Sequence, residues 1–408
     1  MAPHRWLSVL AVTAASIRPE RIPVLDLKAL RTPEQVAALG RACAEPGFFH
    51  VVNHGVPTEV IAAFEQATRA FFALPVDVKR RVKRTATNSR GYADDEFTKR
   101  TRDYKQLYDY GHTPRPDLPS DAPENRVMDG HNQLPDLPGF REAVEAYYAC
   151  CAEVCDELLD AVARSLDVAP EAFRKLFAGG HTSYLRLNAY PAAKDRHVQS
   201  DVNLDADRLV NGAEDLSETP LDKLEGPRLG VNRHFDAGVL TLLYQDHSIS
   251  SLQVNLNAHR SGPPHWIDVA PVENALTVNV GDMLQVLSNG RYRAPEHRVL
   301  ASPPGVSRVS APFFYNPAYA AEICGPCRRK GQRSSHETRT RATGRARPSA
   351  SGGPSPMRGR CTPPSPGATF ESGASRATSP TRGGRRSRSR TSCFLWMATR
   401  RLRSAHLC

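Results

Sequence analysis

The sequence predicts an α+β protein with an antiparallel double-sheet jelly-roll core, or double-stranded β-helix, preceded by a β-α-β segment and covered by helices. Three observations predict this fold class. Short apolar or alternating runs, separated by turn residues, fill the chain after residue 182, as in double-sheet β folds. Two long segments before that point carry apolar residues at helical spacing. A strand, a helix and a second strand follow one another between residues 22 and 55.

The N-terminal segment is predicted to form a strand, a helix and a second strand. The apolar run Ile22–Leu27 predicts the first strand. Thr32 precedes Pro33 and Glu34, and a proline at the first helical position with an acid behind it is typical of a helix start. The β-rich run Gly47–Gly55, which ends on glycine, predicts the second strand.

Two helices and a series of strands follow. The helices are expected from Thr58 to about Arg81 and from Phe140 to Leu166, and their apolar stripes predict that they cover other elements. From residue 182 the sequence consists of short runs in which apolar and polar residues alternate or all residues are apolar. The expected jelly-roll strands are Ser183–Tyr190, Gly238–Tyr244, Leu252–Asn255, Trp266–Val269, Ala275–Val280 and Val309–Tyr315.

The chain is predicted to divide into unequal parts. An acid-rich interruption over 191–228 has little periodicity, and we interpret it as a surface loop or lid or as a disordered insertion. The last 81 residues are rich in Arg, Ser, Thr, Pro and Gly and are predicted to be disordered. The predicted parts are an N-terminal extension (1–20), an N-terminal region (21–130), a helical linker (131–180), the jelly roll with its insertion (181–320) and a basic tail (328–408).

The net charge of +11 comes from the tail. Residues 328–408 hold 19 of the 54 basic and 2 of the 43 acidic residues, which leaves 35 basic and 41 acidic residues in the body. Arginine-rich runs such as 382–390 can bind phosphate backbones without reading sequence. The acidic body offers no cooperating basic patch, so we expect a small-molecule substrate and no nucleic acid.

Compartment can be predicted from the cysteines and the apolar runs. Nine cysteines without a framework spacing favour a reducing compartment. No apolar run approaches the roughly 20 residues of a membrane span. We therefore expect a cytoplasmic protein without membrane partners, with the alternative that Met1–Ser16 is a short targeting segment.

The candidate chemistry begins with two histidines and an aspartate. His234 and Asp236 are two residues apart, and in an extended chain such residues point to the same face. His297 follows 61 residues after Asp236. Two histidines and one carboxylate form a facial triad that leaves open positions on Fe(II), as oxygen chemistry requires. Arg308 then follows in an apolar run and has no acidic neighbour in sequence. A buried arginine needs an anionic partner, and a dicarboxylate would fit.

The segment from Ile22 to about Pro317 resembles the isopenicillin N synthase-like branch of Fe(II)/2-oxoglutarate dioxygenases. The matching motifs lie in the same order over some 300 residues. They are Gly47–Pro57, Arg90–Tyr92, Tyr104–Lys105, Tyr108–Gly111, Arg186–Pro191, His234–Asp236, Leu240–Asp246, Leu252–Val254, Trp266–Val269, Val278–Gln285, Asn289–Gly290, His297–Val299 and Arg308–Ser310.

The resemblance implies a role for seven side chains. His234, Asp236 and His297 would bind Fe(II). Arg308 and Ser310 would bind the distal carboxylate of 2-oxoglutarate. Tyr190 would hydrogen-bond the near carboxylate, with a core tyrosine as the alternative, and Asn188 would support the site. With O2 as the third reactant, the family oxidises an unactivated C–H bond and releases succinate and CO2.

The chain departs from the family in four places. Tyr190 and His234 are separated by more residues than in plant members, Ser250–Ser251 stands where the family usually has two glycines, and Asn274–Ala275 stands where it has Gly-Ala. After Pro317 the family usually closes with a helix, whereas this chain turns into basic low complexity. As a hypothesis, the tail is a frameshift product, because shifted codons over 366–390 can spell a pattern resembling the family's own terminus. An intact frame in the transcript across codons 318–335 would contradict it.

Several interpretations stay open from sequence. The first is an oxygenase that hydroxylates, desaturates or otherwise oxidises a small organic metabolite with 2-oxoglutarate. The alternative is an oxidase similar to isopenicillin N synthase or aminocyclopropane carboxylate oxidase, which do not consume 2-oxoglutarate. A non-catalytic jelly-roll binding protein is disfavoured because three candidate ligands and the arginine are all present. Substrate identity and oligomeric state do not follow from the fold.

Overall fold

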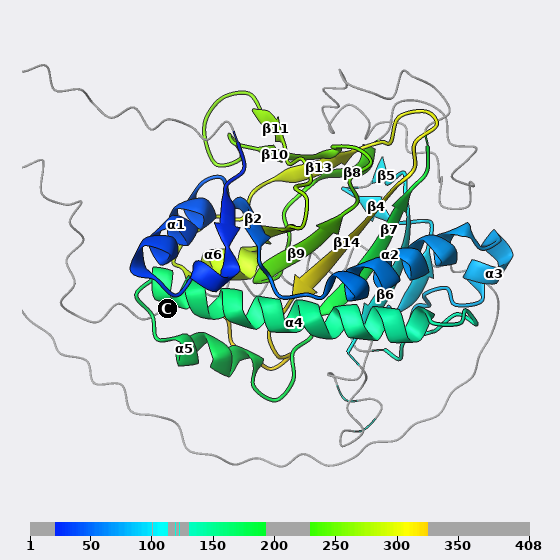
Figure 1. Ribbon diagram of the computed structural model, residues 1–408, viewed down its shortest axis with the longest axis horizontal. Helices are drawn as coiled ribbons and strands as arrows, with labels where there is room; N and C mark the ends of the chain where they lie inside the picture. The colour runs from blue at the N-terminus through cyan, green and yellow to red at the C-terminus, as the bar shows by residue number, and fades with distance from the viewer. Residues whose placement is uncertain are drawn as a thin grey trace, which may run out of the picture. The chain divides into compact units, whose positions relative to one another are not determined.

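The computed structural model describes residues 21–99, 101–112, 119, 122, 130–192 and 229–324, all within one compact unit. Two sheets form its centre, as the predicted fold class requires (Figure 1). In strand order, the large sheet is β1 (Val24–Asp26), β2 (Phe48–Val52), β12 (Leu276–Val280), β9 (Leu240–Gln245), β14 (Arg308–Tyr315), β7 (Tyr184–Tyr190), β6 (Gln106–Gly111) and β3 (Gly91–Ala93). The small sheet is β11 (Trp266–Asp268), β10 (Leu252–Asn255), β13 (His297–Leu300) and β8 (Leu229–His234), and a separate hairpin pairs β4 (Phe97–Thr98) with β5 (Thr101–Arg102).

The predicted β-α-β segment is confirmed. β1 and β2 pair in parallel, and α1 (Pro33–Ala44) connects them after a short 3-10 turn, η1 (Leu27–Ala29). Thr32 caps α1, because its side-chain oxygen accepts a hydrogen bond from the Gln35 backbone N–H at 3.3 Å. All other strand pairs among the described residues of the two sheets are antiparallel.

The helix expected from Thr58 to about Arg81 is wrong as one element. It is two helices, α2 (Thr58–Ala73) and α3 (Val76–Arg80), separated by Leu74 and Pro75. Proline disfavours the helical region for the residue before it, and Leu74 is accordingly extended at ψ 151°. The second long helix is confirmed as α4 (Phe140–Ser165). Besides η1, three short helical elements of the described residues were not predicted: α5 (Pro170–Arg174), η4 (Lys175–Phe177) and α6 (Asp282–Leu287).

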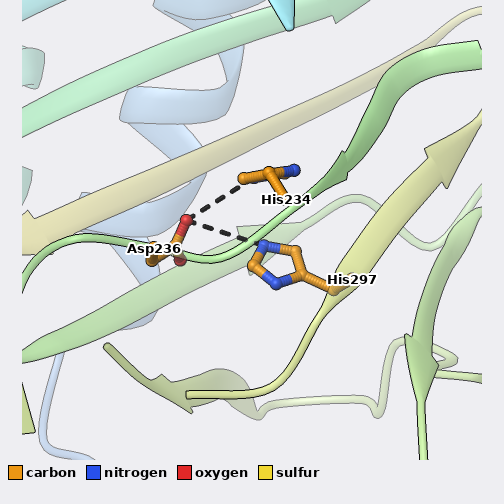
Figure 2. A group of neighbouring side chains, drawn as sticks. All are labelled: His234, Asp236 and His297. Carbon is orange, nitrogen blue, oxygen red and sulfur yellow. Dashed lines mark ion pairs between the residues drawn. The ribbon is translucent and has the colours of Figure 1, made fainter. Parts of the chain in front are cut away.

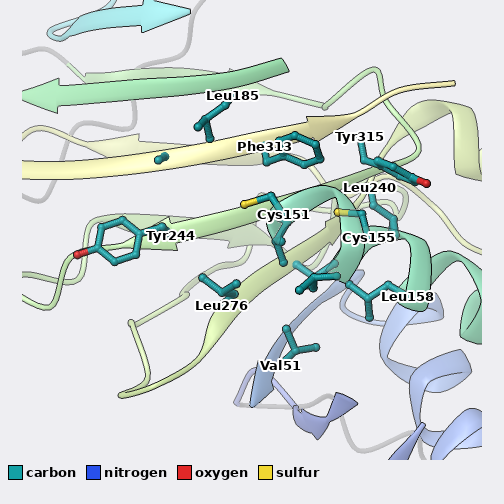
Figure 3. Close-up of a cluster of buried hydrophobic side chains, with 14 of the residues drawn as sticks. Val51, Cys151, Cys155, Leu158, Leu185, Leu240, Tyr244, Leu276, Phe313 and Tyr315 are labelled. Atoms are coloured by element: carbon teal, nitrogen blue, oxygen red, sulfur yellow. The ribbon is translucent and has the colours of Figure 1, made fainter. Parts of the chain in front are cut away.

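The helices cover one face of the large sheet. α4 packs on β9 and β14 and contacts α1 and α2, and Figure 1 shows it running along the sheet. Cys151, Cys155 and Leu158 of α4 face the apolar side chains of the sheet (Figure 3). Successive strand residues point to opposite faces, so one residue set meets the helices while the other set faces the small sheet. The helix-facing set from the strands includes Leu185, Leu240, Leu242, Tyr244, Leu276, Phe313 and Tyr315.

The opposite face of the large sheet packs against the small sheet. Phe48, Leu243 and Tyr190 of the large sheet join an apolar group with small-sheet residues. The small-sheet members and their neighbour are Val231, Leu252, Val254, Val299 and Val269. This space between the sheets is where the candidate site lies.

The N-terminal extension, almost all of the 191–228 insertion and the basic tail lie outside the described residues. The predicted divisions at residues 130, 180 and 320 stay predictions. Within the described ranges, no helix combines the length and the apolarity needed to cross a membrane.

Candidate metal and co-substrate site

His234, Asp236 and His297 meet between the two sheets. His234 ends β8 and His297 begins β13, and these two residues are direct partners in the antiparallel pairing. Asp236 lies in the connection from β8 to β9. Asp236 Oδ1 is 3.5 Å from His234 Nε2 and 3.6 Å from His297 Nε2, as the dashed lines in Figure 2 show. The three candidate ligand atoms lie within 4.8 Å of one another.

Backbone carbonyls orient both imidazoles. His234 Nδ1 lies 2.8 Å from the Asn232 carbonyl oxygen, and His297 Nδ1 lies 3.1 Å from the Pro295 carbonyl oxygen. A carbonyl can only accept, so each Nδ1 carries the proton and each Nε2 presents a lone pair to the space shared with Asp236. Burial and the neighbouring His234 lower the pKa of His297 to about 4, which keeps this imidazole neutral near pH 7.

One carboxylate oxygen of Asp236 is held by hydrogen bonds, and the other faces His234 and His297. Its Oδ2 accepts hydrogen bonds from Thr241 Oγ1 at 2.6 Å and from Asn279 Nδ2 at 2.8 Å. Burial by itself would raise the pKa of Asp236, but the nearby histidines and the bond from Thr241 outweigh it and hold the pKa below its usual range. The cluster therefore offers one anionic oxygen and two imidazole nitrogens, a donor set suited to Fe(II) with positions left open.

Gly281 fixes the backbone that carries Asp236. Asp282 N donates to Asp236 O at 2.7 Å, and a Cβ added at Gly281 would lie 2.0 Å from Gly238 O and 3.2 Å from Asp236 O. Neither backbone atom can yield without moving the β8–β9 connection.

Gly281→Ala is therefore expected to displace Asp236 and weaken Fe(II) binding by roughly tenfold or more, with a stability loss of about 1–3 kcal/mol from overpacking. Calorimetric Fe(II) titration and thermal unfolding measure the two effects. Gly262→Ala is the control: it carries backbone strain at φ +120° but its Cβ meets nothing within 4 Å. Unchanged Fe(II) affinity in Gly281→Ala would show that this contact does not position Asp236.

Arg308 is a buried cation with unused hydrogen-bond donors. It begins β14, is 1% exposed, and lies with its guanidinium carbon 5.0 Å from the centre of the Tyr190 ring. Nη2 donates to Gln245 Oε1 at 3.0 Å, whereas Nε and Nη1 have no hydrogen-bond partner among the described residues. Buried donors without partners cost folding free energy, so we expect this guanidinium to bind an anion.

The structure brings Asn188, Tyr190 and Ser310 to the same patch as Arg308. Tyr190 pairs with Arg308 and Asn188 pairs with Ser310 across β7 and β14, so all four side chains share the inward face. Asn188 Oδ1 is also buried without a hydrogen-bond partner among the described residues. A Cβ added at Gly230 would lie 2.8 Å from Tyr190 Cδ1, so β8, which ends at His234, packs directly on this patch.

The predicted residues thus form two adjoining groups, but the residues that orient them had no predicted role. Thr241, Gln245 and Asn279 lay inside the quoted motifs. Residue alternation could have found Thr241 and Gln245, because they have opposite parity to the helix-facing Leu240, Leu242 and Tyr244 of the same strand.

Two family models match the chain. The N-terminal model of non-haem dioxygenases in morphine synthesis matches residues 22–137, and the model of the 2OG-Fe(II) oxygenase superfamily matches residues 182–317. The second match contains all seven predicted site residues.

Curated relatives match over most of their length. A homoarginine-6-hydroxylase from Arabidopsis thaliana is 31% identical over 294 residues, covering 71% of this chain and 79% of the relative. A homoarginine-6-hydroxylase from Glycine max is 32% identical and the match covers 69% and 77%. Jasmonate-induced oxygenase 4 from Arabidopsis thaliana is 31% identical and the match covers 72% of each chain.

Solved structures share the fold. JOX2 in complex with 2OG, Fe and JA matches at a TM-score of 0.58 and 28% identity, covering 76% of this chain and 79% of that one. The rice dioxygenase for auxin oxidation matches at a TM-score of 0.54 and 26% identity, covering 75% and 86%. A 2OG-Fe(II) oxygenase family protein from Caulobacter crescentus matches at a TM-score of 0.56 and 25% identity, covering 73% and 87%.

Proposed function

The chain belongs to the 2OG-Fe(II) oxygenase superfamily, and from this premise we propose that its iron is held by His234, Asp236 and His297 and its 2-oxoglutarate by the Arg308 patch. It is an Fe(II)- and 2-oxoglutarate-dependent dioxygenase that also consumes O2. The observation that carries the residue assignment is the pairing of an oriented His-Asp-His cluster with a buried arginine whose Nε and Nη1 lack partners among the described residues.

The donor set fits Fe(II). Asn232 and Pro295 carbonyls fix the imidazoles so that each Nε2 is free, and Thr241 and Asn279 hold the carboxylate so that Oδ1 is free. Such outer hydrogen bonds orient metal ligands and set their protonation. Three protein ligands leave positions for a co-substrate chelate and for O2.

The arginine patch fits a dicarboxylate. Arg308 and Ser310 would receive the distal carboxylate, because a buried guanidinium with unused donors forms strong charge-assisted hydrogen bonds. Tyr190 lies beside Arg308 and is 2% exposed, and we assign it to the near carboxylate with Asn188 in support.

The protein contributes orientation and a dry space. When bound, iron and 2-oxoglutarate supply the oxidising chemistry, with 2-oxoglutarate converted to succinate and CO2. Phe48 contacts His297 edge to face at 5.4 Å between ring centres, and Leu243 and Val299 line the same space. These apolar side chains exclude water around the ligands and so strengthen the electrostatic contacts of Asp236 and Arg308.

We propose that the substrate is a small organic metabolite oxidised at a C–H bond. The relatives support this class, since two are named as homoarginine hydroxylases, one structural neighbour was solved in complex with JA, and another is a dioxygenase for auxin oxidation. We also place the enzyme in the cytoplasm, since Cys43, Cys150, Cys151, Cys155 and Cys324 form no disulfide within the part of the chain that the structure describes.

The function is tested by 2-oxoglutarate turnover in the full-length chain with Fe(II) and O2. With candidate substrates present, we expect succinate from the wild type and none from Asp236→Ala. Succinate in both proteins would indicate contaminating metal chemistry. Bound iron with no succinate, with or without candidate substrates, would instead favour the oxidase alternative.

A further inference from the structure

We propose that Gln245, Thr277 and His50 form a positioning relay for Arg308, which rests on the proposed role of Arg308 in 2-oxoglutarate binding. The relay, defined as these three side chains, crosses the large sheet from strand to strand. β2, β12 and β9 are consecutive in the sheet and contribute His50, Thr277 and Gln245, and the next strand, β14, carries Arg308. The relay runs on the inward face, the same face that carries the site.

The contacts are continuous and buried. Arg308 Nη2 donates to Gln245 Oε1 at 3.0 Å, Gln245 Nε2 donates to Thr277 Oγ1 at 3.0 Å, and Thr277 Oγ1 lies 3.1 Å from His50 Nδ1. The four side chains are between 1% and 5% exposed. Buried polar groups in a connected, satisfied network hold one geometry more firmly than isolated pairs do.

The chain of donors has one consistent direction. Arginine can only donate, so Gln245 must present its carbonyl to Arg308 and its amide to Thr277. We assign the Thr277 hydroxyl proton to the contact with His50, so that His50 Nδ1 accepts and the ring proton lies on Nε2. Burial lowers the pKa of His50 to about 4, so the ring is neutral near pH 7 and can accept. The second Gln245 amide proton reaches the Val269 carbonyl oxygen at 3.3 Å, which opposes an amide flip.

The relay holds Arg308 through its Nη2. With Nη2 engaged by Gln245, the guanidinium cannot rotate freely, while Nε and Nη1 have no partner among the described residues and keep donors for an anion. Thr241, a second threonine on the same face, instead orients the proposed metal ligand Asp236 by donating a hydrogen bond to it. The sheet therefore orients the metal ligand and the co-substrate ligand through separate threonines.

Thr277→Val and Thr241→Val are matched tests, because each removes one buried hydroxyl at nearly constant volume. In anaerobic calorimetry, we expect Thr277→Val to weaken 2-oxoglutarate binding to the Fe(II)-loaded protein about tenfold, or about 1.4 kcal/mol, with unchanged Fe(II) affinity. Thr241→Val is expected to weaken Fe(II) binding first. Thr277→Ser keeps both hydrogen bonds and is expected to restore 2-oxoglutarate affinity.

Gln245→Glu gives a second test that does not depend on Thr277→Val folding. Its carboxylate would pair with Arg308 and compete with 2-oxoglutarate, so we expect a loss of roughly 100-fold or more in affinity. If folded Thr277→Val or Gln245→Glu binds 2-oxoglutarate as the wild type does, the relay has no positioning role. If the Fe(II)-loaded wild type itself binds no 2-oxoglutarate, the proposed co-substrate site is wrong instead.

Discussion

Asp236→Asn is expected to lower the affinity for Fe(II) by at least about 100-fold, or about 2.7 kcal/mol. The substitution removes the one anionic donor of the cluster without changing its shape. It also replaces one of the two accepting oxygens with an NH2 group that can only donate, whereas Thr241 and Asn279 both donate to Oδ2. The new amide must present its carbonyl to these donors, so its NH2 group points at the place where the metal would bind.

Anaerobic Fe(II) titration by calorimetry measures this loss. Asp246→Asn is the matched control, because Asp246 is equally buried but binds Val309 N at 2.6 Å and Arg69 at 3.0 Å, away from the histidines. It is expected to reduce stability and leave Fe(II) affinity unchanged. If Asp236→Asn binds Fe(II) with the affinity of the wild type, Asp236 is not an iron ligand.

Arg308→Leu is expected to weaken 2-oxoglutarate binding by roughly 100-fold or more while leaving Fe(II) affinity unchanged. The guanidinium is the charged partner proposed for the distal carboxylate and is 1% exposed, so water cannot take its place. The measurement is 2-oxoglutarate calorimetry on the Fe(II)-loaded protein.

Stability gives a second readout for the same variant. Removing Arg308 relieves two buried nitrogens that have no hydrogen-bond partners among the described residues but also leaves Gln245 Oε1 without its donor, so we expect little net change in the unfolding free energy of the ligand-free protein. Arg298→Leu is the control, because Arg298 stacks on Trp266 at 4.2 Å and bonds Gln253 on the small sheet. A large stability loss in Arg308→Leu with unchanged 2-oxoglutarate binding would mean that the arginine is structural.

Much of the fold and the site could be predicted because the information is local. The period of two in the strands separates residues such as Leu242 from Leu243, and His-x-Asp places two side chains on one face without knowledge of the rest of the chain. The break at Pro75 was also visible locally, since proline restrains the residue before it, but the apolar spacing across Thr58–Arg81 concealed it.

The orienting contacts could not be predicted, because they depend on strand register. Asn279 reaches Asp236 only because β12 pairs with β9 as Asn279 to Thr241. A slip of one residue would turn Asn279 to the helix side and bring an apolar neighbour to Asp236. The sequence shows that these residues are polar; it does not show which strand each one meets.

A buried charge network beside the site escaped prediction for the same reason. Arg186 shares the inward face of β7 with Asn188, bonds Asp109 through Nε and Nη2 at 2.7 and 2.9 Å, and reaches Glu96 at 2.7 Å. Lys105 lies 3.1 Å from Glu96. Only the pairing of β6 with β7 brings Asp109 opposite Arg186. Buried charges of this kind are tolerated because they are paired.

The most direct test is an anaerobic titration of the full-length protein with Fe(II) and then 2-oxoglutarate, recording the weak visible charge-transfer band of an Fe(II)–2-oxoacid chelate. We expect the band in the wild type, its loss in His234→Ala and His297→Ala, and a shift of its half-saturation to much higher 2-oxoglutarate in Arg308→Leu. A band of equal strength and equal half-saturation in all four proteins would contradict the assignment of iron to His234, Asp236 and His297 and of 2-oxoglutarate to Arg308.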